Sequence, residues 1–351
     1  MSVTTAGTLS NEQIKPSISL RTIEIRWGFL FILPWIIGFI LFTAGPMVGS
    51  LYLSFTDYNI TGKTGPAWIG TRNFTDILSL EIKTLTSPTQ NASEVLDHGY
   101  AELGRVGNMV VGASDTDFWI SLRVTIFFGL MALPIGMFVS LCLALLLNTK
   151  VPGVRFFRTL IYSPVVVPGV VTAALFLQLL ARSQGWLNLA LARIGIVGPD
   201  WLNSAEWVLP AFVIVGLWTA GGSMLIYLAG LQSIPTELYE AAKVDGAGGW
   251  VRFRRITLPL LTPVLLYDLV LGLIGTFQYF LIPYVLTRGQ GTPGKSAFFF
   301  NMYLYKTAFT YYRMGYASAL AWLLFIIVIV ITMLVFRTSG SWVFYAGGTK
   351  R

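Results

Sequence analysis

The chain has 351 residues, of which 55% are hydrophobic and only 11% are charged, and its mean hydropathy is +0.69. These values exclude an ordinary soluble domain and favour an integral membrane protein. The formal net charge of +8 would suit a nucleic-acid-binding protein in a soluble chain, but here the basic residues lie beside long apolar runs, so membrane topology explains them and no nucleic-acid partner is expected.

Six apolar runs predict an all-α integral membrane protein with six transmembrane helices. Each run is close to or longer than the roughly 20 residues needed to cross the hydrocarbon core of a bilayer. The expected spans cover residues 27–53, 119–147, 159–181, 207–230, 262–286 and 316–336. Because the number of spans is even, both termini are expected on the same side of the membrane. The single cysteine, Cys142, lies in the second span and excludes an intrachain disulfide.

The polar N-terminal tail, residues 1–26, precedes the first span. A secretory signal peptide is the competing interpretation, but the run 27–53 is too long for the apolar region of a signal peptide and lacks a convincing cleavage site. Basic residues in this tail, in the links on the same side and in the C-terminal tail, residues 337–351, indicate that all of them are cytoplasmic. The opposite loop after the fifth span also carries four basic residues, so the charge pattern alone leaves the orientation open.

The loop of residues 54–118 is the largest polar region and is predicted to be extracytoplasmic. Its middle part, residues 80–115, is mixed in charge and ends in Gly, Ser and Asp, so we expect a small surface element there. Either a contact with a substrate-binding protein or a passive surface insertion fits this composition. His98, in the same loop, has no partner residue that would suggest a metal site.

A second polar segment, residues 232–260, separates the fourth and fifth spans. Pro235 marks the start of a helix with Thr236 as its N-cap, and Asp245-Gly246 supplies a sharp turn before a second, arginine-rich run. The pattern therefore predicts two short helices joined at a glycine. A small apolar face on the first helix would consist of Leu238, Ala241 and Ala242.

Three groups of residues in this segment follow one another at set distances: Glu240-Ala241-Ala242, Asp245-Gly246-Ala247 and Ile256-Thr257-Leu258-Pro259. In these residues the segment resembles the EAA loop of binding-protein-dependent ABC-transporter permeases. The preceding residues, Tyr227 to Gln232 with Ile234-Pro235, resemble the carbohydrate branch of that family, the maltose-type (MalF-like) permeases. The resemblance extends from about residue 27 to residue 345. In one departure, Val124 stands where many relatives carry Asn, so no role of that Asn is carried over.

The resemblance implies partners and roles. In that family the EAA loop is a cytoplasmic coupling helix seated in a cleft of an ATPase subunit. The chain would lie in the prokaryotic cell membrane and pair with a second, homologous permease and two ATPase subunits, which hold ATP and Mg. An extracytoplasmic sugar-binding protein would deliver the substrate. The implied coupling residues are Leu238, Glu240, Ala241, Ala242, Asp245, Gly246, Ala247, Ile256 and Pro259. An ordinary amphipathic connector is the alternative interpretation of the segment.

Residues Gly289 to Ser296 match the P-loop pattern G-x-x-x-x-G-K-S. A functional P-loop lies between a buried strand and a helix, where backbone N–H groups surround the phosphates. Here the pattern follows a membrane span on the expected outer face, without a βαβ context. We therefore expect a chance match, no nucleotide site and no cofactor on this chain.

Polar and aromatic residues inside the spans are candidates for a substrate pathway, because intramembrane polar groups are costly. Sugars are bound by aromatic faces and by amides, and the candidates offer both: Gln278, Tyr279, Phe280 and Tyr284 in the fifth span, with Trp218 and Gln178 in the fourth and third. Helix packing is the alternative role for each of them. Asp268, which lies nearer the cytoplasmic interface, is expected to make a structural hydrogen bond.

These observations favour a permease subunit of an ATP-driven carbohydrate importer. The chain is not expected to be an enzyme, because it has no second His, no Cys pair and no acid pair on one helix face. An ion-gradient-driven secondary transporter is the alternative, although it would need an ion-coupling group near the midplane, and no good candidate is present. A non-transporting scaffold would give no reason for the EAA loop.

Overall fold

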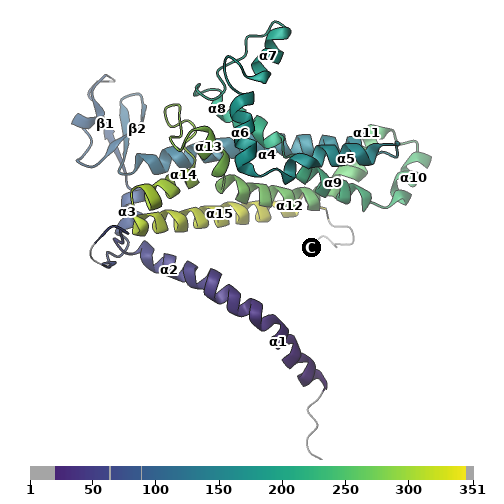
Figure 1. The fold of residues 1–351 in the computed structure, drawn as a ribbon, viewed down its shortest axis with the longest axis horizontal. Helices are drawn as coiled ribbons and strands as arrows, with labels where there is room; N and C mark the ends of the chain where they lie inside the picture. Colours follow the sequence, from purple (N-terminus) through teal and green to yellow (C-terminus); the bar gives the residue numbers. More distant parts are fainter. Residues whose placement is uncertain (1–19, 63–64, 88, 345–351) are drawn as a thin grey trace, which may run out of the picture. The chain divides into compact units, whose positions relative to one another are not determined.

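The computed structural model describes residues 20–62, 65–87 and 89–344, and in this part the chain is mostly helical (Figure 1). Most of the expected N-terminal tail and the last seven residues of the expected C-terminal tail lie outside the described residues. The chain divides into two compact units, residues 1–52 and 53–351, which are described separately.

The first unit contains one long apolar helix. It consists of α1 (Leu20–Phe39), the π-helical turn η1 (Ile40–Ala44) and most of α2 (Gly45–Ser54). The N–H of Gly45 bonds to the carbonyl of Ile40 in the π register, directly before Pro46, which has no N–H to donate. None of the residues in its most apolar stretch is buried, as expected for a helix whose surroundings are lipid or another protein.

Four helices of the described chain are long and apolar enough to cross a membrane, and two bent helix pairs raise the number of possible spans to six. The four are Glu24–Ser54, Thr116–Leu147, Gly249–Leu286 and Met314–Trp342. The bent pairs are Val154–Val166 with Gly169–Leu179, at 99°, and Val208–Leu217 with Gly221–Gln232, at 50°. Each expected apolar run overlaps one of these helices or bent pairs, but the third and fourth runs are not single straight helices.

The third run is broken at a proline that the hydrophobic pattern did not register. The helix begins at Val154, earlier than expected, after Gly153 with φ +87°. It comprises α5 (Val154–Tyr162), the 3₁₀ turn η3 (Ser163–Val166) and α6 (Gly169–Leu179). Pro168 disfavours helical dihedrals in the residue before it, and Val167 is extended. The run therefore changes direction in its middle.

The fourth and fifth runs are also interrupted. The fourth consists of α8 (Val208–Leu217) and α9 (Gly221–Gln232). A Cβ atom on Gly221 would lie 2.2 Å from the carbonyl oxygen of Ile161, so the start of α9 packs directly on the α5 backbone. The fifth consists of α11 (Gly249–Arg252), the π turn η4 (Phe253–Thr257), α12 (Leu258–Phe277) and, after a break, α13 (Leu281–Leu286).

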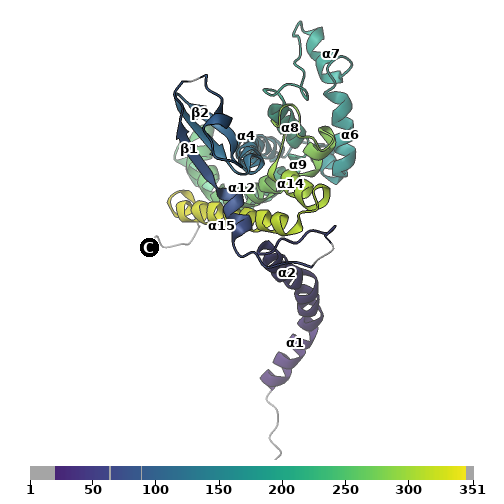
Figure 2. The ribbon, with the colours of Figure 1, turned by 90° about the vertical axis from the view of Figure 1, so that its left-hand side faces the viewer.

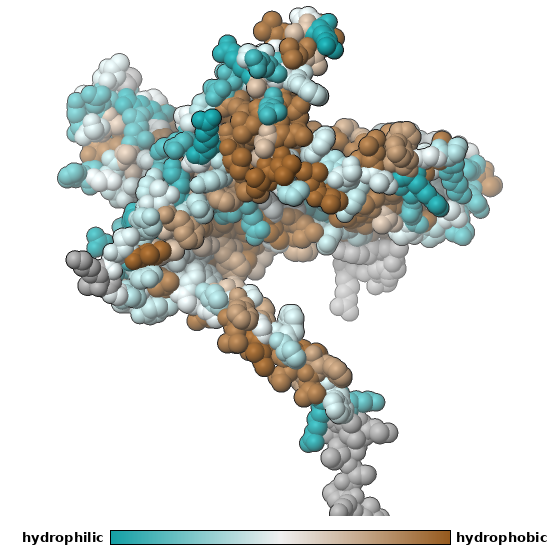
Figure 3. All heavy atoms as spheres, in the orientation of Figure 1, coloured by the Kyte–Doolittle hydropathy of each residue, from teal (hydrophilic) through white to brown (hydrophobic). Residues whose placement is uncertain are grey.

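The second unit is built around α4 (Thr116–Leu147), which packs against α8, α9 and α12, while α12 also packs against α15 (Met314–Trp342). In Figure 1, α4, α12 and α15 lie side by side with roughly parallel axes, with the sheet at one end and α10 (Thr236–Val244) at the other. Figure 2 looks along these helices from the sheet end, and in both views α6 leads away from them to α7 (Trp186–Arg193). Figure 3 shows hydrophobic residues over α6 and hydrophilic ones around the sheet and α10.

Two hydrophobic cores lie one behind the other along these helices. The sheet-end core includes Phe176 of α6, Phe212 of α8 and Phe299. The coupling-end core includes Tyr227 of α9 and Leu261 of α12, with Ile161 of α5 packed against it. The breaks between α5 and α6 and between α8 and α9 thus fall between the two cores, whereas α12 continues from one into the other.

The loop after α2 corrects the expectation of an all-α fold, because it contains a small sheet. Its elements are α3 (Arg72–Leu78), β1 (Leu80–Thr84), the 3₁₀ turn η2 (Ala92–Glu94), β2 (Ala101–Val106) and β3 (Met109–Ala113). All strand pairs are antiparallel, in the order β1-β3-β2, with Leu80 opposite Ala113. Leu85, Ala92, Leu96 and Val110 form a separate core beneath the sheet. These strands are short and weakly alternating, so their pattern was not recognised.

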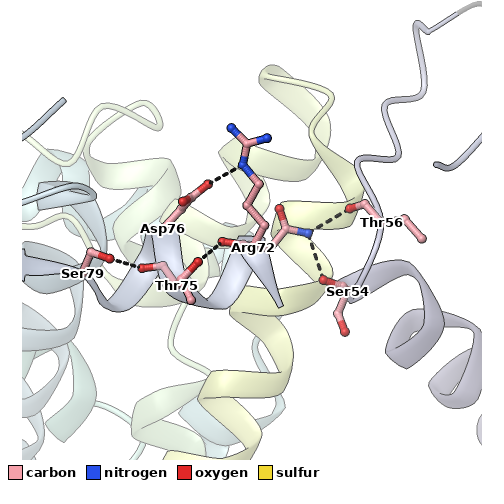
Figure 4. Close-up of polar contacts among 7 residues, drawn as sticks. Ser54, Thr56, Arg72, Thr75, Asp76 and Ser79 are labelled. Carbon is pink, nitrogen blue, oxygen red and sulfur yellow. Dashed lines mark hydrogen bonds and ion pairs between the residues drawn. The ribbon is translucent and has the colours of Figure 1, made fainter. Parts of the chain in front are cut away.

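The sheet is attached to the helices through α3, which precedes β1, and α4, which follows β3. Figure 4 shows the polar contacts along α3, with Ser54 and Thr56 beside its start. The amide of Asn73 donates to the carbonyls of Ser54 and Thr56 at 2.9 and 2.8 Å, and this buried side chain fixes the start of α3. The two ends of the sheet meet, because the N–H of Ser114 donates to the carbonyl of Ser79 at 3.1 Å.

Candidate functional site

The segment between α9 and α12 forms the two predicted short helices, α10 and α11. One detail of the prediction is wrong: Thr236 is the first residue of α10 and not its cap. Pro235 occupies the N-cap position, and no side chain makes a capping hydrogen bond there. Proline fits this position because its fixed φ leads into the helix and its missing N–H would have no helical partner.

The turn at the end of α10 explains why Asp245-Gly246-Ala247 follows Glu240-Ala241-Ala242 at a set distance. The N–H of Ala247 donates to the carbonyl of Ala242 at 2.8 Å, and the N–H of Gly246 donates to the carbonyl of Lys243 at 3.0 Å. Gly246 has φ +77°. This pair of bonds with a left-handed residue is the Schellman motif, in which glycine avoids the steric penalty of a Cβ atom. Ala242, Gly246 and Ala247 thus belong to one C-terminal helix cap.

The outer surface of the segment exposes apolar side chains on a fixed base. Val244, Trp250 and Leu238 are 88%, 71% and 43% exposed. At the base, the hydroxyls of Tyr239 and Thr257 are hydrogen-bonded at 2.9 Å, and Tyr239 packs against the coupling-end core. An exposed apolar surface on a rigid base is typical of a protein-binding site.

The expected coupling residues do not all lie on this surface. Leu238, Glu240, Ala241, Asp245 and Gly246 are exposed, whereas Ala242 and Ala247 are half-buried. Ile256 packs against the coupling-end core, and Pro259 lies in the first turn of α12. The last two residues therefore belong to the base of the segment.

Asp268 joins α12 to α9. Its carboxylate accepts hydrogen bonds from the hydroxyl of Ser223, at 2.7 Å, and from the hydroxyl of Tyr227. The predicted structural hydrogen bond is confirmed, and there are two of them.

A pocket of about 540 Å³ opens at the break between α12 and α13. It brings together two of the candidate pathway residues, Gln278 and Phe280, with residues of α14 (Phe300–Tyr305), η5 (Lys306–Thr310) and α15. The lining residues are Gln278, Phe280, Asn301, Leu304, Tyr305, Phe309, Ala321 and Leu324. The lining combines amides with aromatic rings and includes no charged side chain.

The sequence pattern did not indicate the other amide and aromatic residues of the lining, which are Asn301, Tyr305 and Phe309. They are spaced four residues apart and so lie on one face of α14 and η5. This spacing is the available signal, but the apolar run ends at Leu286 and the polar, glycine-rich residues after it predict a loop. The N–H of Phe300 donates to Thr125 Oγ1 at 3.0 Å, which fixes the start of α14 against α4.

The remaining candidates lie elsewhere. Tyr279 points into the sheet-end core, where its ring centroid is 4.7 Å from that of Phe128. Tyr284 does not line the pocket, but its ring is 5.4 Å from that of Tyr305. Trp218 packs edge-on against Phe176 at 5.9 Å, and Gln178 is exposed on α6. Gln278 and Phe280 are therefore the candidates that share a cavity.

The loop with the P-loop pattern follows the helix α13 and no strand. Its lysine, Lys295, is ion-paired with Asp117 of α4 at 2.5 Å. Nearby, the buried carboxylate of Asp115 accepts hydrogen bonds from the hydroxyls of Tyr303 and Tyr316, at 2.5 and 2.6 Å. The basic and hydroxyl groups of this region thus hold α4, α14 and α15 together. Within the described ranges no group of three His, Cys, Asp or Glu residues is placed to hold a metal ion.

Comparison with known proteins identifies the family. Residues 122–342 match the sequence profile of the binding-protein-dependent transport system inner membrane component. The chain is 35% identical over 335 residues to the probable ABC transporter permease protein YesP of Bacillus subtilis, which covers 95% of this chain and 96% of the relative. It is 30% identical to the trehalose/maltose transport system permease protein MalF of Thermococcus litoralis, over 91% of this chain and 96% of that protein.

A solved structure agrees with this result. The fold is similar to a chain of the bacterial alginate ABC transporter in complex with an alginate pentasaccharide-bound periplasmic protein, with a TM-score of 0.71, 25% identity and coverage of 91% of this chain and 96% of that one. The chain belongs to the family of binding-protein-dependent inner membrane transport components. It is a multi-pass permease subunit of an ABC importer and not an enzyme.

Proposed function

We propose that this permease carries an uncharged di- or oligosaccharide. The observation that supports this most directly is the pocket at the α12–α13 break, where two amides and three aromatic rings face a cavity without a charged residue. Aromatic rings suit the apolar faces of sugar rings, and amides suit their hydroxyls. The name of one relative, a trehalose/maltose permease, points to the same class. The alginate transporter imports an acidic polysaccharide, so the likeness to it supports a carbohydrate in general, and the uncharged class rests on the lining of the pocket.

The proposed assembly contains this chain, a second homologous permease, two ATPase subunits and an extracytoplasmic sugar-binding protein. ATP and Mg are bound by the ATPase subunits. Each bent helix pair counts as one span, which gives six spans with both termini in the cytoplasm. The loop 54–118 then lies outside and the segment 232–260 inside, as the basic residues of that segment favour.

The exposed part of the segment 232–260 is the proposed contact with an ATPase subunit. Leu238, Ala241 and Ala242 make the close apolar contact, and the Schellman turn at Gly246 holds α10 at a fixed angle to α11. Closure of the ATPase pair moves this segment as a rigid unit. Because the coupling-end core includes its base, the core moves with it.

The substrate pathway opens and closes when the coupling-end core moves against the sheet-end core. The breaks between α5 and α6 and between α8 and α9 provide the hinges, since they lie between the cores. The pocket lined by Gln278 and Asn301 belongs to the sheet-end half, so access to it from the cytoplasm depends on this movement.

The test is uptake by the complete complex in proteoliposomes. The binding protein that co-purifies with the complex is first screened against neutral and acidic oligosaccharides, and the one it retains is used in tritiated form. ATP-dependent uptake of a neutral sugar that persists when ion gradients are collapsed is the expected result. Uptake that needs a gradient and ignores ATP would instead support a secondary transporter, and retention of acidic sugars alone would contradict the substrate class.

A further inference from the structure

Asp268 is the one charged residue in the two helices that enter and leave the segment 232–260. Its carboxylate accepts hydrogen bonds from Ser223 and Tyr227 of α9. An ionisable side chain in a membrane helix is costly and needs a reason beyond helix packing, which apolar residues achieve as well. Tyr227 is fully buried and Asp268 is half-buried, so this contact is partly shielded by the protein.

A second contact joins the same two helices closer to the segment. A Cβ atom on Gly230 would lie 2.8 Å from Leu261 Cδ1 and 2.9 Å from Val264 Cγ2, so α9 and α12 approach closely there. Apolar contacts of this kind keep two helices together but leave them free to slide, because they are not directional. Hydrogen bonds are directional, and the two at Asp268 fix the position of α9 along α12.

We propose that Asp268 is a positioning residue that locks α9 and α12 in register, so that a displacement of the coupling segment is delivered to both helices at once. This inference rests on the proposed coupling role of the segment. α12 continues unbroken from the segment into the sheet-end core, whereas α9 stops at the break before Gly221. Without the hydrogen bonds to Asp268, α12 would be displaced further than α9. The break between α8 and α9 would then not bend together with the displacement of α12.

The experiment compares variants in the complete reconstituted complex by the number of sugar molecules imported per ATP hydrolysed. The probe is the tritiated oligosaccharide selected by the binding protein. Asp268→Leu and Tyr227→Phe each remove the Tyr227–Asp268 hydrogen bond. Asp268→Asn keeps the shape and can still bond both hydroxyls, as acceptor to one and donor to the other. Tyr267→Phe, on the exposed neighbouring tyrosine, is the matched control.

We expect the Leu and Phe variants to retain ATP hydrolysis stimulated by the binding protein. In Tyr227→Phe the ratio of import to hydrolysis should fall by about tenfold, the scale of one lost hydrogen bond to a charged group. In Asp268→Leu, which also loses the bond from Ser223, the ratio should fall at least as far. Asp268→Asn and Tyr267→Phe should stay close to wild type. If Asp268→Leu does not assemble, Tyr227→Phe decides the question, because it removes a single hydroxyl.

Three results would overturn the proposal. The ratio could be unchanged in both disruptive variants. Import and hydrolysis could fall together with the yield of complex, which would indicate a purely structural contact. Asp268→Asn could uncouple as strongly as Asp268→Leu, which would indicate a role for the charge. A wild-type complex without ATP-dependent import would contradict the proposed function itself, and so is distinguishable from all three.

Discussion

Ala247 and Ala242 are joined by a backbone hydrogen bond of 2.8 Å across the end of α10, and this bond forms only if the residue between the helix and Ala247 adopts a left-handed conformation. Gly246 is that residue, with φ +77°. The geometry of the proposed ATPase contact therefore depends on the left-handed backbone conformation of a single glycine, Gly246.

Gly246→Val should abolish import while the protein stays in the membrane. A β-branched residue in the left-handed region costs about 1–2 kcal/mol, which is enough to open the turn and misdirect α10. Gly248→Ala is the matched control, since Gly248 has φ −67° and open space around it. Membrane content is measured by immunoblot and import in proteoliposomes. Import by the Val variant at the wild-type rate would rule out a need for this turn.

Ala242→Arg should prevent the ATPase subunit from binding. The apolar surface on α10 is small, and a long charged side chain at its half-buried edge would hold the partner away. The measurement is the amount of ATPase subunit that co-purifies with the tagged permease. Lys243→Ala, at the next position around the helix, should leave co-purification unchanged. Equal loss in both variants would show that the effect is not specific to this face.

Asn301→Leu should slow import by about tenfold, because a site that binds a hydroxyl through an amide loses roughly 1–2 kcal/mol when the amide is removed. Tyr305→Leu should have a similar effect through loss of the aromatic face. Phe325→Leu, on the exposed side of α15, is the control for general effects on packing. ATP hydrolysis should remain coupled in all three. A normal import rate in both pocket variants would place the sugar pathway elsewhere.

The sheet of the outer loop should respond to pH in a predictable way. The hydrogen bond between Lys83 and Asp97 lowers the pKa of Asp97 and raises the pKa of Lys83, with Glu81 contributing to both. The stabilisation from Asp97 is present above the ordinary carboxyl range and is lost as the pH falls through it. That from Lys83 is present below the ordinary lysine range and is lost only as the pH rises beyond it.

Sheet stability is therefore expected to be constant between about pH 5 and pH 9 and to decrease on either side. Hydrogen-exchange protection factors of the β1 and β3 amides, measured in the full chain, report this directly. Lys83→Met should flatten the acid side of the profile. A profile that is unchanged in this variant would show that the ion pair does not contribute.

The parts of the structure that follow from local chemistry were predictable from the sequence. The apolar runs indicated where the long apolar helices lie. Asp245-Gly246 indicated the turn, because glycine readily adopts the left-handed conformation that commonly ends a helix. The breaks were harder to predict. Pro168 was visible in its run, but membrane helices often tolerate proline, so the residue alone does not decide between a kink and a 99° bend.

The pocket at the break between α12 and α13 shows the limit of the same reasoning. Gln278 and Phe280 were candidates because they are an amide and an aromatic residue inside an apolar run. Tyr279 between them is also aromatic, but it faces the core. Which of three consecutive residues lines a cavity depends on where α12 ends, and that is set by tertiary packing. Asn301 joins the pocket only because Thr125 of α4 fixes the start of α14, a contact between residues 175 positions apart.

The hydrogen bond between Ser114 and Ser79 makes the sheet a self-contained cassette. The chain leaves α3 and returns to α4 at nearly the same point, and the cassette has a core of its own. Its removal with a short linker should leave the helices in place, and another folded element could be inserted at the same two residues. This site therefore offers a place for a fluorescent or affinity module on the permease.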